Sequence, residues 1–203
     1  MKALTKSTQE QITPTAALQM LIDGNARFVQ NKMIQRDLQE QIADTSEGQF
    51  PFAAILSCID SRVPAEIVFD QGIGDVFSAR VAGNIVNEDV LGSIEYACKV
   101  AGSKIVVVMG HTKCGAVTAA CNNVELGNIT ALLSKIKPAV KKYSTGAEMD
   151  EETIERVAVQ NVLFSIEAMK SDSPILAEMV ESNEILIVGA IYNVSNGQVK
   201  FID

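Results

Sequence analysis

The stretch from residue 105 to residue 115 reads Ile-Val-Val-Val-Met-Gly-His-Thr-Lys-Cys-Gly, and it decides how the rest of the chain is interpreted. Its first five residues are apolar, uninterrupted and mostly β-branched, which is typical of a strand buried on both faces. The polar segment that follows contains the single histidine of the chain, His111, and a cysteine, Cys114. The sequence therefore predicts a central strand whose carboxyl end carries chemically active side chains.

A second apolar run, residues 52–56, predicts another strand buried on both faces. It is followed by residues 58–62, which read Cys-Ile-Asp-Ser-Arg. Ligands of open α/β sheets bind outside the carboxyl ends of the strands, at a topological switch point. If the two strands are neighbours in one sheet, Cys58, His111 and Cys114 converge at that edge.

The rest of the chain alternates between predicted strands and helices. We expect strands over 76–79, 185–188 and 199–202, helices over 90–100, 114–121 and 150–169, a helix from residue 173 onward, and one helix with a loop within 128–149. Asn196-Gly197 is a strong hairpin signal, so the last strand should pair antiparallel at an edge. The fold class predicted is α/β, with a mainly parallel central sheet of four strands plus an antiparallel edge strand, flanked by helices.

The N-terminal part is predicted to form a helical arm over residues 13–48, after a polar and loose segment over 1–12. Thr13 is a suitable N-cap, and Pro14 suits the first position of a helix. An apolar stripe follows at helical spacing, made of Leu18, Leu21, Ile22, Phe28 and Val29. This exposed stripe is expected to pack on another part of the fold or on another subunit. No linker stands out, so residues 1–203 are interpreted as a single domain.

Composition excludes several classes of protein. The 203 residues are 47% hydrophobic and 21% charged, as in ordinary globular proteins, and no apolar run approaches the length of a membrane span. With 17 basic and 25 acidic residues the net charge is −8, which disfavours nucleic acid and anionic membrane surfaces as partners. Four cysteines and no apolar leader segment favour free thiols and a cytoplasmic location, with a removed leader left open.

Two thiolates and one imidazole suit zinc, and three protein ligands with one open position are typical of catalytic zinc. A closed structural site would have to recruit Cys98, Cys121 or a carboxylate. Cys121 lies two helical turns from Cys114, about 10 Å along the axis, which is too far for one metal ion. We therefore expect Cys98 and Cys121 to be small core residues. Taken alone, His111-x-x-Cys114 also fits a buried histidine beside a core thiol.

The segment 58–62 together with His111-x-x-Cys114 resembles the paired signature of the β-class carbonic anhydrases. Further segments that resemble the family are Gly24-Asn25-x-Arg27-Phe28, residues 80–84 (Arg-Val-Ala-Gly-Asn) and residues 94–97 (Ile-Glu-Tyr-Ala). The resemblance extends from about residue 14 to the end of the chain.

The resemblance implies a zinc enzyme for the reversible hydration of CO2 to bicarbonate and a proton. One zinc ion per chain would be held by Cys58, His111 and Cys114, and zinc hydroxide would attack CO2. Asp60 and Arg62 match the catalytic dyad that orients the nucleophile and gates the fourth zinc position. In the family's closed state Asp60 itself becomes the fourth ligand. The chain has no tryptophan, which members closed by bicarbonate use, so the open type is expected.

The resemblance also implies a substrate pocket and an assembly. Gln49, Phe77 and Tyr96 match positions that line the CO2 pocket of plant-type members, partly from a partner subunit. Ala82 stands where many of these members carry Val. The backbone N–H of Gly115 is a candidate contact for bicarbonate, because such groups at a helix start favour anions. A homodimer is expected, with a tetramer as the larger alternative.

Chemistry adds two expectations and leaves alternatives. A zinc site with two thiolates is formally neutral and should acidify its water less than a three-histidine site, so activity should rise above pH 7. Because His111 is assigned to zinc, the product proton must leave through Tyr96, a carboxylate, a water chain or external buffer. The alternatives are a hydrolase of CS2 or COS on the same scaffold and a non-catalytic zinc- or redox-binding protein. Nucleotide binding is disfavoured, since Gly72-Ile73-Gly74 lacks a third glycine at the required spacing.

Overall fold

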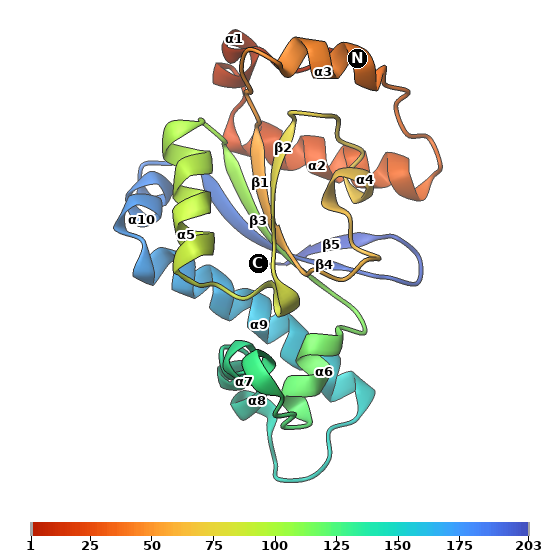
Figure 1. Cartoon of the computed structure of the whole chain (residues 1–203), viewed down its shortest axis with the longest axis vertical. Coiled ribbons are helices and arrows are strands. Elements are labelled where there is room, and N and C mark those ends of the chain that lie inside the picture. Colours follow the sequence, from red (N-terminus) through yellow and green to blue (C-terminus); the bar gives the residue numbers. More distant parts are fainter. Residues whose placement is uncertain (1, 203) are drawn as a thin grey trace.

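The computed structural model describes residues 2–202, which form an α/β fold around one five-stranded sheet (Figure 1). The strands are β1 (Ala53–Ser57), β2 (Val76–Arg80), β3 (Ile105–His111), β4 (Leu186–Tyr192) and β5 (Val199–Ile202). Their order in the sheet is β2-β1-β3-β4-β5, and every pair is parallel except β4–β5. The predicted sheet of four parallel strands and one antiparallel edge strand is confirmed.

Helices cover both faces of this sheet (Figure 1). They are α1 (Lys6–Glu10), α2 (Pro14–Val29), α3 (Leu38–Thr45), α4 (Ala65–Val68), α5 (Glu88–Glu95), α6 (Gly115–Cys121), α7 (Gly127–Ser134), α8 (Lys137–Tyr143), α9 (Glu151–Asp172) and α10 (Pro174–Glu181). Two short elements complete the fold, the 3₁₀ turn η1 (Ala82–Asn84) and the π-helical turn η2 (Tyr96–Val100).

The sheet separates two hydrophobic clusters, because alternate side chains of a strand point to opposite faces. Ile55 and Val107 belong to the cluster under α2 and α4, whereas Leu56 and Val108 belong to the cluster under α5, α9 and α10. All residues of β1 and β3 are buried, as their continuous apolar sequences predict. The two central strands therefore form a rigid platform for the loops at their carboxyl ends.

The register of the central strands sets the position of the candidate ligands. Ser57, the last residue of β1, pairs with Met109 of β3, and His111, the last residue of β3, pairs with Tyr192 of β4. The loops after β1 and β3 therefore leave the sheet side by side, as expected from the two apolar runs. A third hydrophobic cluster, around α6, α8 and the start of α9, packs beneath these loops and includes Cys58 and Cys114.

The expectation that residues 1–12 are loose is wrong, because α1 lies within them. Thr5 caps this helix in a reciprocal capping box with Thr8. Gln9 is only 4% exposed, and its Nε2 donates to the carbonyls of Pro51 (2.7 Å) and Ala101 (2.8 Å). A polar side chain that satisfies two buried carbonyls orders this segment, and hydrophobic periodicity gives no sign of it.

The apolar stripe of α2 packs on the chain's own fold, which confirms the first of the two expected alternatives for it. Leu21 is fully buried, and Leu18 and Phe28 pack against the chain's own core, whereas Ile22 remains 37% exposed. A Cβ atom on Gly24 would lie 1.9 Å from the carbonyl oxygen of Phe69, so only glycine allows this close approach. The helix therefore packs on its own fold along most of the stripe.

Two other predicted segments differ in detail. Residues 128–149 contain two helices, α7 and α8, rather than one, because Pro138 lies in the first turn of α8, where its missing N–H has no helical partner to lose. The helix predicted over 90–100 starts earlier, at Glu88, and ends as the π-helical turn η2. No helix within residues 2–202 is both long enough and apolar enough to cross a membrane.

Candidate metal centre

Three side chains selected from the sequence meet at the carboxyl ends of β1 and β3. Cys58 directly follows β1, His111 ends β3, and Cys114 is the N-cap residue of α6. One ligand atom from each of them lies within 4.8 Å of the other two. All three residues are buried, with at most 4% of their surface exposed. Three soft or borderline donors at this spacing match the ligands that zinc prefers.

The ring of His111 is oriented for metal binding. Its Nδ1 lies 2.9 Å from the carbonyl oxygen of Thr112, and a carbonyl only accepts, so Nδ1 carries the proton. The lone pair of the neutral ring is therefore on Nε2. That buried atom has no hydrogen-bond partner among residues 2–202. A buried nitrogen without a partner, facing two thiols, fits a metal ion as its missing partner.

The surroundings of Cys58 favour its thiolate. Hydrogen bonding from the Cys114 thiol lowers the pKa of Cys58 well below its usual range, although burial opposes this, and His111 and the backbone N–H of Gly83 act in the same direction as Cys114. The same bond, together with burial, raises the pKa of Cys114. By contrast, burial alone raises the pKa of Cys98 to about 12. The hydrogen bond between the two clustered thiols therefore favours ionisation of Cys58, whereas burial disfavours ionisation of Cys98.

Asp60 and Arg62 form an ion pair beside this cluster. Arg62 Nε donates to Asp60 Oδ1 (2.9 Å) and its Nη2 donates to Oδ2 (2.8 Å). The side-chain hydrogen bond from Arg62 lowers the pKa of Asp60 to about 2. Asp60 Oδ2 lies 3.9 Å from His111 Nε2, so the carboxylate is next to the ligand atoms without belonging to their cluster.

Two residues that the sequence did not single out for this role hold the ligand loops. Arg80, the last residue of β2, donates to the carbonyl of Cys58 (3.1 Å) and to that of Asp60 (2.6 Å). Glu155 of α9 accepts from the backbone N–H of Lys113 (2.7 Å), between the ligands of the second loop. Arg80 lies in a segment that resembles a family motif, whereas nothing in the sequence around Glu155 indicates its contact.

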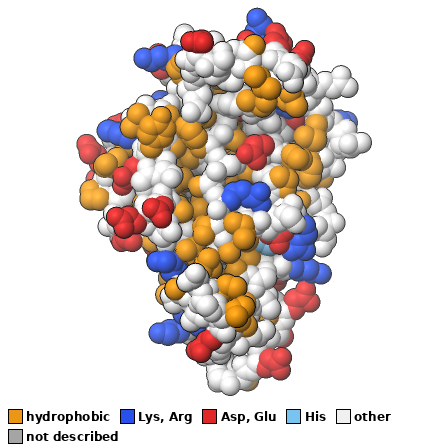
Figure 2. Space-filling model, viewed as in Figure 1, with side chains coloured by type: hydrophobic (Ala, Val, Ile, Leu, Met, Phe, Trp, Pro, Cys, Tyr) orange, Lys and Arg blue, Asp and Glu red, His pale blue; other side chains and the backbone are white. Residues whose placement is uncertain are grey.

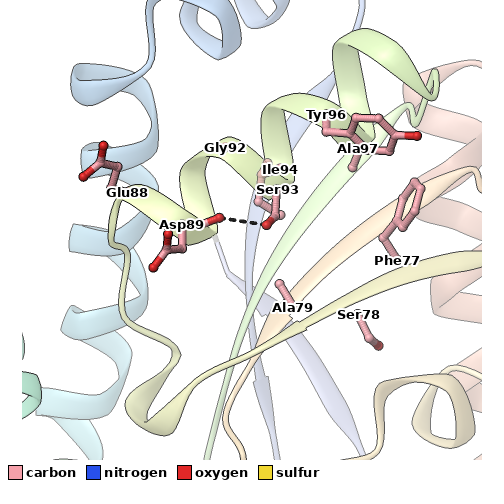
Figure 3. A pocket seen from close by; sticks show the side chains of 10 residues that line it. All are labelled: Phe77, Ser78, Ala79, Glu88, Asp89, Gly92, Ser93, Ile94, Tyr96 and Ala97. Atoms are coloured by element: carbon pink, nitrogen blue, oxygen red, sulfur yellow. Dashed lines mark hydrogen bonds between the residues drawn. The ribbon is translucent and has the colours of Figure 1, made fainter.

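A pocket lies at the edge of the sheet, between β2 and α5 (Figure 3). The rings of Phe77 and Tyr96 meet there edge to face, with centroids 6.2 Å apart. Residues that also line this pocket are Ser78, Ala79, Glu88, Asp89, Gly92, Ser93, Ile94 and Ala97. None of them is a candidate metal ligand or a member of the Asp60–Arg62 pair. The pocket and the metal cluster are therefore separate features of the chain.

The other predicted pocket residues are dispersed. Gln49 is exposed and lines a different hollow, which it shares with Tyr96, while Ala82 is the half-buried first residue of η1 and Gly115 is the first residue of α6. Figure 2 shows groups of hydrophobic side chains on this face, one of them near the end of α5. In η2, which follows α5, Tyr96 is 53% and Val100 is 70% exposed. Within residues 2–202, the structure thus does not gather the five predicted pocket residues into one cavity.

The chain was compared with known proteins. The sequence model of the carbonic anhydrase family matches residues 53–199. A carbonic anhydrase of Mycolicibacterium smegmatis is 34% identical over 193 residues, which cover 92% of each chain. Carbonic anhydrase 2 of Mycobacterium tuberculosis is 34% identical over 197 residues, covering 94% of this chain and 93% of that protein.

Solved structures agree with these relatives. The β-carbonic anhydrase CafA of Aspergillus fumigatus superimposes with a TM-score of 0.76 at 27% identity, covering 93% of this chain and 90% of that one. A tetrameric β-carbonic anhydrase of Sordaria macrospora superimposes with a TM-score of 0.72 at 25% identity, covering 77% of this chain and 83% of that one.

Proposed function

We propose how the residues of this chain, which belongs to the β-class carbonic anhydrase family, carry out the family's reaction. That reaction is the reversible hydration of CO2 to bicarbonate and a proton. Cys58, His111 and Cys114 hold one zinc ion per chain. The observation that carries this assignment is the buried, unpartnered Nε2 of His111, which faces two thiols within 4.8 Å. When bound, zinc supplies a Lewis acid that lowers the pKa of a water molecule towards neutrality.

Asp60 accepts a hydrogen bond from the reacting water at Oδ2 and so orients its lone pair towards CO2. This role is supported by the position of Oδ2, 3.9 Å from His111 Nε2, and by the pKa of Asp60, which the hydrogen bond from Arg62 lowers to about 2. A carboxylate that stays ionised at neutral pH accepts and never donates. Arg62 holds both carboxylate oxygens through two parallel bonds, which keep Asp60 off the metal position in the open state.

We assign the apolar wall of the CO2 site to Phe77 and Tyr96, at the sheet edge between β2 and α5, and propose that assembly with a second chain brings this wall to a metal cluster. Their edge-to-face contact supports this, since it forms an apolar surface at the sheet edge. Gln49, Ala82 and the N–H of Gly115 remain proposed substrate contacts. Because the five residues do not share a cavity in one chain, we propose that a partner subunit completes the pocket.

That partner is a second copy of this chain, in a homodimer or a tetramer. The tetrameric relative from Sordaria macrospora supports oligomerisation, and the exposed Tyr96 and Val100 supply apolar surface at the pocket edge. We also propose a cytoplasmic location, supported by the free thiols of all four cysteines.

The experiment that tests the function compares Cys58→Ala with Cys98→Ala. Stopped-flow CO2 hydration and zinc content are measured on the same samples, near pH 7.0 and pH 8.5. The parent should hold about one zinc per chain, hydrate CO2 and be faster at the higher pH, because a neutral site acidifies water less strongly. Cys58→Ala should lose zinc and at least about 1,000-fold of the rate. Cys98→Ala removes a similarly buried thiol from a different hydrophobic cluster and should keep both the zinc and the rate.

Other results of this experiment would support a different function or contradict the proposal. A zinc-loaded chain that hydrates no CO2 at either pH but hydrolyses CS2 or COS would assign it to that alternative substrate class. Zinc without any of these activities would leave a zinc-binding protein. A chain that binds no zinc would contradict the proposal, and so would a Cys58→Ala variant that retains the activity of the parent.

A further inference from the structure

The Cys58 thiol accepts a hydrogen bond from a backbone group that lies far from it in the sequence. The N–H of Gly83 donates to Cys58 Sγ at 3.4 Å. Gly83 belongs to η1, the turn between β2 and α5. A hydrogen bond to a ligand sulfur fixes its direction and withdraws electron density from it, so the position of this N–H affects how the sulfur binds a metal.

The backbone of η1 has an unusual conformation at this point. Gly83 has φ +68° and Asn84 has φ +42°, both in the left-handed region that residues with a side chain rarely adopt. A Cβ atom on Gly83 would lie 2.6 Å from Ile136 Cδ1, so a side chain there would have to displace the end of Ile136. The left-handed conformation of Asn84 carries a conformational cost, so the surrounding structure must hold the turn in place.

Helix α9 provides that support with two buried polar side chains. Asn161 Nδ2 donates to the carbonyl of Gly83 at 2.8 Å, and Ser165 Oγ donates to the carbonyl of Asn84 at 3.1 Å. Asn161 is 3% exposed and Ser165 is 6% exposed. The two residues are four positions apart and therefore share one face of the helix. They fix two successive carbonyls of the turn whose N–H reaches Cys58.

We propose that Asn161 and Ser165 are positioning residues for Cys58: they hold η1 in the conformation in which the Gly83 N–H meets the ligand sulfur. Through this turn they set the orientation of Cys58 and its electron donation to zinc. The proposal rests on the proposed function, because that function assigns Cys58 to zinc.

Gln160 offers a matched control on the same helix. It is the residue before Asn161, it is also a buried amide with 4% exposure, and its Oε1 accepts from Lys142 Nζ of α8 at 2.6 Å. Gln160→Ala therefore removes a buried hydrogen bond of α9 that does not involve η1. The comparison separates an effect on the ligand from a general loss of packing in the helix.

The test uses the full-length chain and the variants Asn161→Ala, Ser165→Ala and Gln160→Ala. Folding is checked by circular dichroism, and zinc affinity is measured by competition with a chelator. Each protein is also loaded with Co²⁺, and the sulfur-to-cobalt charge-transfer absorption is recorded. This band reports the electron density on sulfur and does not respond to stability alone.

We expect zinc affinity to fall about tenfold in Asn161→Ala, which removes the bond to Gly83 itself, and about threefold in Ser165→Ala, which removes only the bond to the next residue, Asn84. The charge-transfer band should move to lower energy in both variants, because a sulfur that loses a hydrogen bond gives up electrons more easily. Gln160→Ala should match the parent in affinity and in band position.

Three results would overturn the inference. The first is that Asn161→Ala and Ser165→Ala both keep the zinc affinity and the charge-transfer band position of the parent, while the parent holds about one zinc per chain. This result would leave the proposed function intact. The second is an equal change in Gln160→Ala. The third is a parent that binds no zinc, which also refutes the proposed function. If Asn161→Ala does not fold, Ser165→Ala decides, since it removes a single hydroxyl group.

Discussion

Two aspartate–arginine sites in this chain differ in how completely the protein encloses them. The Asp60–Arg62 pair lies at the mouth of the metal cluster, with 18% of the Asp60 side chain and 48% of the Arg62 side chain exposed. Asp70 pairs with Arg27 and Arg36, and its own side chain is fully buried. The chemistry of the two ion pairs is the same, but only the first remains accessible to solvent and substrate.

The bonds made by each carboxylate explain the difference. Asp70 accepts from Arg36 at Oδ1 and from both Arg27 and the backbone N–H of Ile34 at Oδ2. It thereby ties α2 and the segment after it to the end of α4. Asp60 is held through a single neighbour, Arg62, and its Oδ2 faces the ligand side. A carboxylate enclosed by cations stabilises the fold, whereas one held from one side can act on a substrate.

The largest expected effect is the loss of stability in Asp70→Asn. Arg36, with 7% of its side chain exposed, would remain buried without its ion-pair partner. The free energy of unfolding should fall by about 3 kcal/mol, as measured by chemical denaturation. Asp60→Asn should lose less than about 1 kcal/mol, because the pair is partly exposed. An Asp70→Asn variant as stable as the parent would remove the distinction between the two sites.

Asp60→Asn should instead lose activity. We expect CO2 hydration to fall about 100-fold with zinc content unchanged, since the amide is neutral and presents a donor where the reaction needs a charged acceptor. Asp23→Asn, an exposed carboxylate of α2 that within residues 2–202 accepts only from Gln19 of the same helix, is the control and should keep the parent rate. Full activity in zinc-loaded Asp60→Asn would contradict the catalytic role of this pair.

Arg62→Lys tests the pair further, because it keeps the positive charge and removes the two-bond geometry of the guanidinium group. A lysine ammonium cannot reproduce the two parallel bonds from Nε and Nη2, so Asp60 should be held less firmly. The rate should fall about tenfold, with stability close to that of the parent. Stopped-flow hydration and denaturation on one preparation measure both, and a parent-like rate would mean that charge alone suffices.

The smallest expected effect is on acid stability. Burial by itself raises the pKa of Asp70, but the bonds from Arg27, Arg36 and the Ile34 N–H outweigh it and lower the pKa. The resulting stabilisation is present above the pKa of an unfolded aspartate, about 3.9, and is lost as the pH falls from there through the lower folded value. The parent should therefore lose more stability than Asp70→Asn in this acidic range. If the free energy of unfolding changed equally with pH in both proteins, Asp70 would contribute nothing to the acid dependence of stability.

The centre of the sheet was predictable because its residues carry a local signal. The apolar runs ending at Leu56 and Met109 predict strands buried on both faces, and the polar segments after them place Cys58 and His111 at one edge. The structure adds what a strand pattern cannot contain, namely the tautomer of His111, which depends on the Thr112 carbonyl.

The supporting residues were not predictable for the opposite reason. Gln9, Glu155 and Asn161 act through hydrogen bonds to backbone groups of residues that are distant in sequence. Such contacts leave no periodicity, since any polar side chain at those positions would fit the surrounding pattern equally well. The dispersion of Gln49 and Phe77 has another explanation under the proposed function, in which a partner subunit completes their pocket.

The sheet order has a consequence for the order of folding events. β1 and β3 are neighbours in the sheet although β2 lies between them in the sequence. His111 and Cys114 are near each other in the sequence and therefore also in the unfolded chain. Cys58 joins them only when β1 pairs with β3, with Ser57 opposite Met109. Parallel pairing of distant strands is a slow, non-local step. Tight zinc binding during refolding should therefore follow the pairing of β1 with β3. The metal would then stabilise a fold that has already formed and would not be needed to start folding.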